Sequence, residues 1–208
     1  MPVGYFVSAL VTLIVVVDPV GLVPTFLAVT HGSSHEQRRG IALRACIIAG
    51  AILAGTALLG NWLLNVLSIT IPAFRIAGGL LLFSVAYEMV LGVRIGRQSK
   101  QAEEAIEERV SDVAAFPLAI PLMAGPGAIT ATLLLAGQAK TDPFLLAVLL
   151  GTVLLAMAAC LVAFFVATRI DRLLGITGNV VLSRLLGVLL AALAVQFIID
   201  GVRAVLPT

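Results

Sequence analysis

Long hydrophobic segments follow one another along almost the whole chain, and polar residues are confined to short stretches between them. No Asp, Glu, Lys or Arg occurs within residues 45–74, 113–139 or 143–168. A helix of about 20 apolar residues spans the ~30 Å hydrocarbon core of a bilayer. The pattern predicts an all-α integral membrane protein whose six transmembrane helices occupy residues 3–29, 40–66, 72–93, 113–137, 143–167 and 180–203.

Composition supports the same class. The chain has 208 residues, of which 61% are hydrophobic and 12% charged, against roughly 25% charged residues in a soluble domain. The pI near 8.8 therefore gives no reason to expect a nucleic-acid partner, and the bilayer is the expected surrounding. Cys46 and Cys160 lie within apolar spans, where small buried side chains are expected rather than a disulfide or a metal site.

Basic residues gather in alternate connections between the predicted spans. One side of the membrane receives Arg38, Arg39, Arg94, Arg97, Lys100, Arg109, Arg169 and Arg172, whereas the other has Lys140, with Arg75 and Arg203 near span ends. The positive-inside rule then places both termini outside the cytoplasm. Residues 97–112 form the longest polar segment, which we interpret as a solvated cytoplasmic linker between a first unit (1–96) and a second unit (113–208).

The two units resemble each other. With an offset of 109 residues, Arg75 aligns with Arg184, and residues 92–94 (GVR) align with residues 201–203 (GVR). With an offset of 107 residues, Asp18-Pro19 aligns with Gly125-Pro126, and Thr25 with Thr132. Each unit has three spans, an odd number, so the second must enter the membrane from the opposite side. The sequence thus predicts two inverted-topology three-helix repeats.

Both repeats contain a break inside a hydrophobic span. Asp is a preferred N-cap and Pro suits a first helical turn, so Asp18-Pro19 predicts that a second half-helix starts within the first span. Gly125-Pro126-Gly127 predicts the same in the fourth span, where Pro117 and Pro121 precede the break. Gly125 has no side chain that caps, so the following amides are expected to stay open. Broken helices of this kind mark transport sites.

We interpret the breaks as a binding site for a small zwitterionic solute. A carboxylate would bind the open helix start, and Asp18 would serve the ammonium side or a coupling proton. The candidate binding residues are Asp18, Pro19, Gly21, Thr25, Gly125, Pro126, Gly127, Thr130 and Thr132. Candidate coupling or gating residues are Asp18, Arg75, Arg184 and Gln196. Alternatively, Asp18 only caps its helix and the arginines only reach the membrane interface. Glu88 and Asp200 are expected near the lipid headgroups.

Four motifs, in order, resemble those of the MarC family (multiple antibiotic resistance protein C, small neutral amino acid transporters). They are residues 18–26 (DPVGLVPTF), 74–83 (FRIAGGLLLF), 121–129 (PLMAGPGAI), and 177–178 with 184–197 (TG, RLLGVLLAALAVQF). Asp18 departs from the asparagine common at that position. The resemblance implies a bacterial or archaeal inner-membrane protein with six helices, related to LysE-type exporters, some members of which move glycine, alanine or similar amino acids.

The leading functional hypothesis is a secondary transporter of small neutral amino acids, coupled to H⁺ or Na⁺, and its small size favours a homodimer. No phosphate-binding Gly-x-x-x-x-Gly-Lys-Ser/Thr loop is present, so the chain itself does not hydrolyse ATP. An exporter or flippase of another small polar metabolite, drug or lipid-linked head group is the alternative. An intramembrane enzyme is disfavoured because the known catalytic motifs are missing. A further alternative is a membrane protein that does not transport and serves as a partner of another complex.

Overall fold

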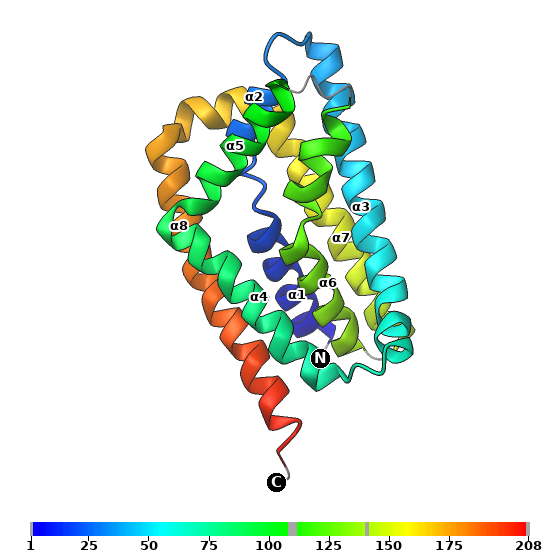
Figure 1. Ribbon diagram of the computed structural model, residues 1–208. Helices are drawn as coiled ribbons and strands as arrows, with labels where there is room; N and C mark the ends of the chain where they lie inside the picture. Colours follow the sequence, from blue (N-terminus) through cyan, green and yellow to red (C-terminus); the bar gives the residue numbers. More distant parts are fainter. Residues whose placement is uncertain (1, 108–111, 140–141, 207–208) are drawn as a thin grey trace.

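The computed structural model describes residues 2–107, 112–139 and 142–206, and every regular element in these ranges is a helix (Figure 1). In chain order the helices are α1 (Pro2–Val17), α2 (Val23–Val29), α3 (His35–Val66), α4 (Ile71–Leu91), α5 (Val93–Glu107), η1 (Ala114–Met123), α6 (Pro126–Ala139), α7 (Pro143–Phe165) and α8 (Ala167–Arg203).

Several of these helices can cross a membrane. Among the described residues, α3, α4, α7 and the Thr177–Arg203 part of α8 are long and apolar enough, and η1 with α6 makes a fifth candidate bent by 55°. The remaining predicted span falls on the shorter apolar helix α1 together with α2. The all-helical membrane class is therefore confirmed, with four or five spans by this measure. The count of six and the inverted repeat remain predictions.

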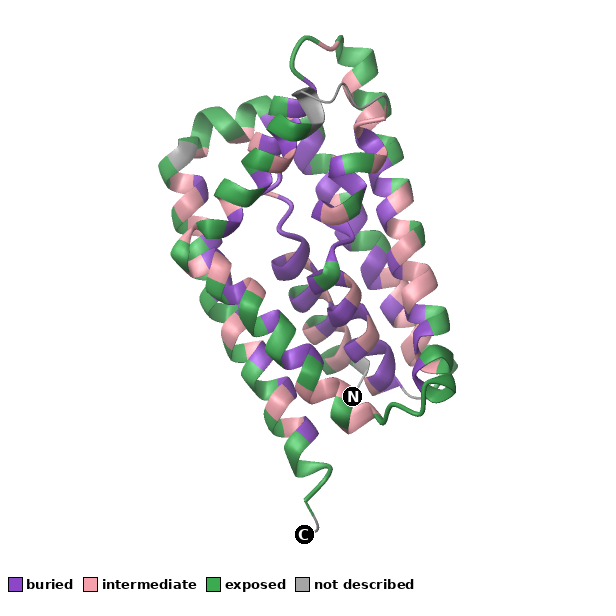
Figure 2. Ribbon diagram, viewed as in Figure 1, coloured by how far each residue is buried: buried purple, intermediate pink, exposed green. Residues whose placement is uncertain are grey.

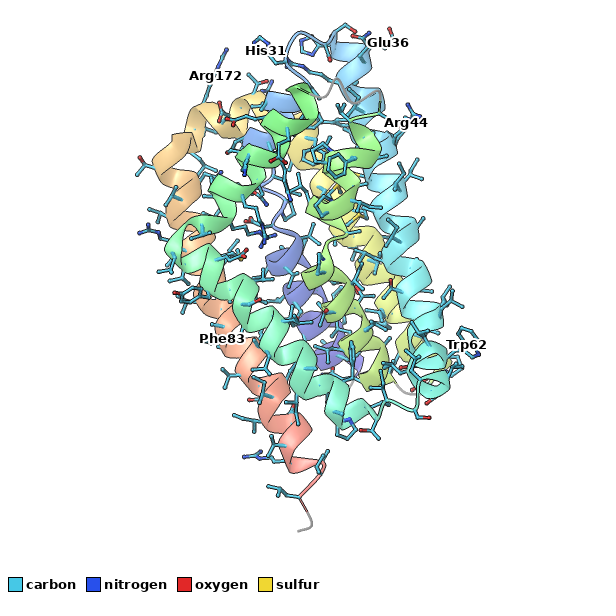
Figure 3. The ribbon with its side chains drawn as sticks, in the orientation of Figure 1. His31, Glu36, Arg44, Trp62, Phe83 and Arg172 are labelled. Carbon is cyan, nitrogen blue, oxygen red and sulfur yellow. The ribbon has the colours of Figure 1, made fainter. Side chains whose placement is uncertain are left out.

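Both ends of the chain lie at the same end of the bundle in Figure 1. Figure 3 shows His31, Glu36 and Arg172 at the opposite end, whereas Trp62 and Phe83 point outward from the helices that carry them. Trp62 is 63% exposed and Phe83 is 43% exposed. Large apolar side chains on the outer face are what a lipid environment requires, because apolar burial there comes from the bilayer rather than from the protein.

The helix starts follow local sequence rules. Ser34 begins α3 with a capping box, in which its hydroxyl accepts from the Gln37 amide and the Gln37 side chain accepts from the Ser34 amide. Asp142 caps α7 through the Phe144 amide at 2.9 Å, and Pro143 follows as the first helical residue.

The buried centre of the molecule is formed around α1 and α6, which the other helices surround (Figure 2). Leu134, Leu135 and Ala136 of α6 are almost fully buried, as are Ala9 and Leu13 of α1. The two central helices are joined by the Tyr5 hydroxyl, which donates to the Leu135 carbonyl at 2.9 Å. The halves of the broken spans therefore lie in the interior, where a backbone break is shielded from lipid.

Helices α4 and α8 pack side by side over most of their length (Figure 1). Their contact depends on glycine. A Cβ at Gly79 would lie 2.8 Å from the Ala194 carbonyl oxygen, and one at Gly187 would lie 3.1 Å from the Ala86 carbonyl oxygen. Small residues let membrane helices approach closely in this way. The helices that the predicted repeat makes equivalent are thus direct neighbours.

Helix α5 covers most of the described part of residues 97–112, the predicted solvated linker, and buries one of its faces. It follows α4 after Gly92, whose φ of 77° ends that helix, and it packs on α2, α4 and η1. Gln98 and Ala102 are 4% and 1% exposed. In Figure 1 α5 starts partway along the bundle rather than beyond its end. Arg109 of the predicted linker and Lys140 of the opposite side lie outside the described residues, and the division into two units stays a prediction.

Candidate ligand-binding site at the broken spans

The first break lies between α1 and α2, at residues 18–22. Asp18 has a left-handed backbone (φ 56°) and is 2% exposed, and its carboxylate accepts a hydrogen bond from the Gly21 amide at 3.0 Å. The residues after it form turns, closed by the Leu22 amide on the Asp18 carbonyl at 3.1 Å. Asp18 therefore closes the turn at the break, and it is not the N-cap of α2, which is Leu22.

The helix after the first break starts later than the sequence predicts. Helix α2 begins at Val23, with Leu22 at the N-cap position and Pro24 in its first turn. The expected helix start at Pro19 is therefore wrong, because the residues after it form turns instead of continuing into the helix. Gly21 is required here, since a Cβ at that position would overlap the Asp18 carboxylate. The Asp18 side chain thus occupies the space at the centre of the break.

The second break lies at Ala124 and Gly125, between η1 and α6. Helix α6 begins at Pro126, as predicted, and its first backbone hydrogen bond runs from the Ile129 amide to the Gly125 carbonyl at 3.0 Å. The amides of Gly127 and Ala128 have no intrahelical partner, as at any helix start. A Cβ at Gly125 would overlap the Pro121 carbonyl oxygen, so the break requires glycine.

A cavity of about 300 Å³ opens at the second break. Its walls come from α1, α4, α5, η1 and α6, which Figure 1 shows around the middle of the bundle. It is lined by Val16, Leu81, Ser84, Val85, Glu88, Arg94, Arg97, Gln98, Gln101, Pro121, Leu122, Gly125, Pro126, Gly127 and Ala128. The predicted site residues Gly125, Pro126 and Gly127 are thus brought to a cavity, and the open start of α6 forms part of its wall.

Arg94 is the buried cation of this cavity. The residue is 6% exposed, and one guanidinium nitrogen donates to the Val16 carbonyl at 2.7 Å while the other lies 3.0 Å from the Met89 sulfur. Val16 is in the last turn of α1, where carbonyls lack intrahelical partners and a positive charge is stabilised by the helix dipole. Arg94 therefore joins the first break to the cavity at the second break.

The rest of the polar wall comes from α4 and α5. Glu88 and Arg97 form an ion pair at 2.9 Å, with side chains 27% and 52% exposed. The Gln101 side-chain oxygen is buried and has no hydrogen-bond partner within the described part of the chain. An acceptor without a partner beside a cavity is available to a donor group of a ligand. The cavity thus offers both cationic and acceptor groups.

The opposite charges of Asp18 and Arg94 attract each other across the first break, although no direct salt bridge joins them among the described residues. Both side chains are almost fully buried. Isolated buried charges are strongly disfavoured, whereas neighbouring opposite charges reduce that cost. Asp18, which does not line the cavity, is thus the buried group of opposite charge near Arg94.

The other predicted binding residues do not line the cavity. Asp18, Pro19, Gly21 and Thr25 belong to the first break and its helix, and of that region only Val16 reaches the wall. The Thr132 hydroxyl donates to the Ala128 carbonyl at 2.8 Å within α6. The methyl of Thr130 faces α4, since it would lie 2.9 Å from a Cβ added at Gly78. Their contribution to binding stays a prediction.

The three predicted gating residues outside the breaks also lie away from the cavity. Arg184 is exposed and its guanidinium would lie 3.8 Å from a Cβ added at Gly92. Gln196 is exposed and donates to the Asp200 carboxylate at 2.8 Å. Arg75 is half-buried on α4 beside Gly201 of α8, and its Nε has no partner in the described structure.

Sequence reasoning missed the polar wall. It placed Arg94 and Arg97 in a connection outside the membrane and Glu88 at the headgroups, whereas all three line the cavity. The reason is the bend at Gly92, which turns α5 back across the bundle. One signal was present: Arg94, Gln98 and Gln101 follow one another at i, i+4 and i+7, which places them on one face of a helix.

A helical membrane bundle with an interior cavity at a broken span is the class of protein that this fold and site define. The sequence comparisons then give the family. The sequence model of a protein family, described as MarC family integral membrane protein, matches residues 3–206. The chain therefore belongs to the MarC family. This confirms the resemblance of the four sequence motifs.

The chain is similar to curated relatives over nearly their full length. It is 40% identical over 199 residues to a UPF0056 membrane protein of Archaeoglobus fulgidus, covering 95% of this chain and 92% of that protein. It is 36% identical over 201 residues to one of Aquifex aeolicus, covering 97% and 94%. It is 34% identical over 196 residues to the UPF0056 membrane protein YhcE of Escherichia coli, covering 94% and 90%. No solved structure matches the chain.

Proposed function

We propose that this protein is a secondary transporter of small neutral amino acids such as glycine, alanine or serine. The observation that carries the proposal is the cavity at the second break, where the open start of α6 and the buried Arg94 face the same space. A helix N-terminus and a guanidinium are both suited to a carboxylate. The substrate carboxylate binds between them, near the middle of the bundle.

Two acceptor groups of the cavity suit the ammonium group. Glu88 and the unpartnered Gln101 oxygen are acceptors on the α4 and α5 side of the cavity. The volume of about 300 Å³ is at the small end of the range for ligand pockets. Such a space favours a small solute that carries both charges over a bulky drug.

The transport cycle follows from the predicted repeat. Two inverted repeats with broken spans allow the cavity to open to either side in turn. The proposed orientation has both termini outside the cytoplasm of a bacterial or archaeal inner membrane, and H⁺ or Na⁺ is the proposed coupling ion. The family membership and the apolar spans support the membrane assignment, whereas substrate, coupling, direction and a homodimeric state are parts of the proposal.

The test is counterflow of radiolabelled glycine in proteoliposomes that contain the purified protein. We expect uptake into vesicles preloaded with glycine, alanine or serine, but not into vesicles preloaded with glycinamide, which lacks the carboxylate. The matched negative control is Gly127→Val, whose side chain would enter the space next to Val85 and Val16. Exchange of another polar metabolite or a lipid-linked head group without amino acid exchange would instead support the alternative exporter or flippase.

A further inference from the structure

Arg94 has more hydrogen-bonding capacity than its protein contacts use. A guanidinium has five N–H donors in a rigid fork, and the structure gives Arg94 the Val16 carbonyl at 2.7 Å and the Met89 sulfur at 3.0 Å. The residue also lines the cavity. Donors are therefore left over on a buried cation at the place where the α6 amides are open.

The neighbours of Arg94 differ in what they provide. The Val16 carbonyl belongs to the buried last turn of α1, which Arg94 of α5 contacts. Asp18 is the first residue of the first break, two positions after Val16. Its carboxylate accepts a hydrogen bond from the Gly21 amide, and it does not line the cavity. It supplies an opposite charge without taking the place of an anionic ligand. Arg94 is thus a buried cation that still has N–H donors available to a ligand.

We propose that Arg94 is a ligand-binding residue that connects the two broken spans: it binds the anionic group of the solute and at the same time holds the carbonyl end of α1, with Asp18 compensating its charge. This inference deepens the proposed function and rests on it for the identity of the solute. Its consequence is mechanical as well. An anion that draws the guanidinium toward α6 also pulls on the Val16 carbonyl. Binding in the cavity is therefore transmitted to the end of α1 at the first break.

The first part of the test is a double-mutant cycle on stability. The variants are Arg94→Gln, Asp18→Asn and the two together, with the thermal midpoint measured in lipid nanodiscs. Each single change leaves one buried charge without its counterpart, and we expect a fall of about 5 °C or more. The double variant should regain at least half of the loss that Arg94→Gln causes.

The matched control cycle uses Arg44 and Asp112, an ion pair of 3.4 Å between different helical segments with side chains 67% and 40% exposed. Exposed pairs contribute little, so Arg44→Gln and Asp112→Asn should change the midpoint by no more than about 2 °C. Additive effects in the Asp18 and Arg94 cycle, equal to those of the control cycle, would overturn the charge compensation.

The second part measures binding by titration calorimetry with glycine and, separately, with acetate, which has a carboxylate but no ammonium. Arg94→Gln should weaken glycine binding at least tenfold, whereas Arg44→Gln in the exposed control pair should leave it unchanged. The double variant should regain stability without regaining affinity. Arg94→Lys should keep more stability than affinity, because a single ammonium lacks the fork that reaches two partners.

The outcomes separate this inference from the proposed function. If the unchanged protein binds acetate but no amino acid, and Arg94→Gln abolishes acetate binding, the anion site stands and the amino acid assignment fails. If Arg94→Gln binds glycine as the unchanged protein does, Arg94 is not a ligand-binding residue. If the unchanged protein binds neither compound, the ligand role of Arg94 is wrong, together with the proposed function.

Discussion

The two breaks align in the sequence, yet they are completed in different ways. At the first break the Asp18 side chain fills the centre and binds the Gly21 amide, and Arg94 comes from another helix to the carbonyl end of α1. At the second break no side chain caps the start of α6, and a cavity lies there instead. One break is filled by a side chain of the protein, whereas the other opens onto the cavity where we propose that the solute binds.

The comparison shows how a membrane protein keeps an interrupted helix in its interior. Every freed backbone group in a bilayer needs a partner, because lipid provides none. The first break finds partners within the chain. The second keeps two amides without an intrahelical partner, which is tolerated only beside a cavity. The asymmetry therefore favours a structural role for the first break, and it supports the proposal that the second break binds a solute.

The largest expected effect is that of Gly125→Ala. Its Cβ would overlap the Pro121 carbonyl oxygen, and backbone atoms cannot move aside as a side chain can. We expect a loss of about 3 kcal/mol in the free energy of unfolding and the loss of glycine exchange. The measurement is denaturant unfolding in detergent micelles.

The control for Gly125→Ala is Gly151→Ala, since a Cβ at Gly151 in α7 meets no atom within 4 Å. That change should be neutral or stabilising, because alanine is a better helix former than glycine. Equal stabilities for the two variants would mean that the second break does not have the close backbone approach described here.

At the first break, Gly21→Ala should destabilise the protein less, by about 2 kcal/mol. The atom in its way is the Asp18 carboxylate, a side chain that can turn away at the expense of its hydrogen bond. The prediction is sharpest in the double variant Asp18→Ala with Gly21→Ala. Its destabilisation should be less than the sum of the single effects, because the obstacle is gone. Strict additivity would contradict the contact.

Asp18→Asn and Asp18→Ala separate the capping role from the presence of the charge. Asparagine tolerates a positive φ and its side-chain oxygen accepts the Gly21 hydrogen bond, whereas alanine does neither. We expect Asp18→Ala to be less stable than Asp18→Asn by about 1 kcal/mol, measured by thermal unfolding of the two proteins side by side. The same midpoint for both would show that the hydrogen bond to Gly21 contributes nothing.

Thr132→Val should have the smallest effect. The Thr132 hydroxyl is hydrogen-bonded within α6 to the Ala128 carbonyl, and the residue does not line the cavity. We expect a change in unfolding free energy of about 0.5 kcal/mol and glycine affinity within about twofold of the unchanged protein. A tenfold loss of affinity would restore Thr132 to the binding site that the sequence predicted.

Much of the fold is determined by the sequence itself. The uncharged segments fix where helices cross the membrane, since a charge in lipid is strongly disfavoured. Ser34, Asp142 and the prolines next to helix starts fix where several helices begin, because capping joins residues only two or three positions apart. The breaks at Asp18 and Gly125 and the open start of α6 can be predicted from the sequence as well, because they also depend on neighbouring residues.

Only the tertiary structure decided which side chains meet at the cavity. The sequence assigned Arg94 and Arg97 to a connection outside the membrane by their charge alone. The left-handed bend at Gly92 turns α5 back between α2, α4 and η1, and this brings Arg94 to Val16, 78 residues earlier in the chain. Local patterns record the preferences of neighbouring residues, whereas a contact between distant helices depends on how the whole bundle packs.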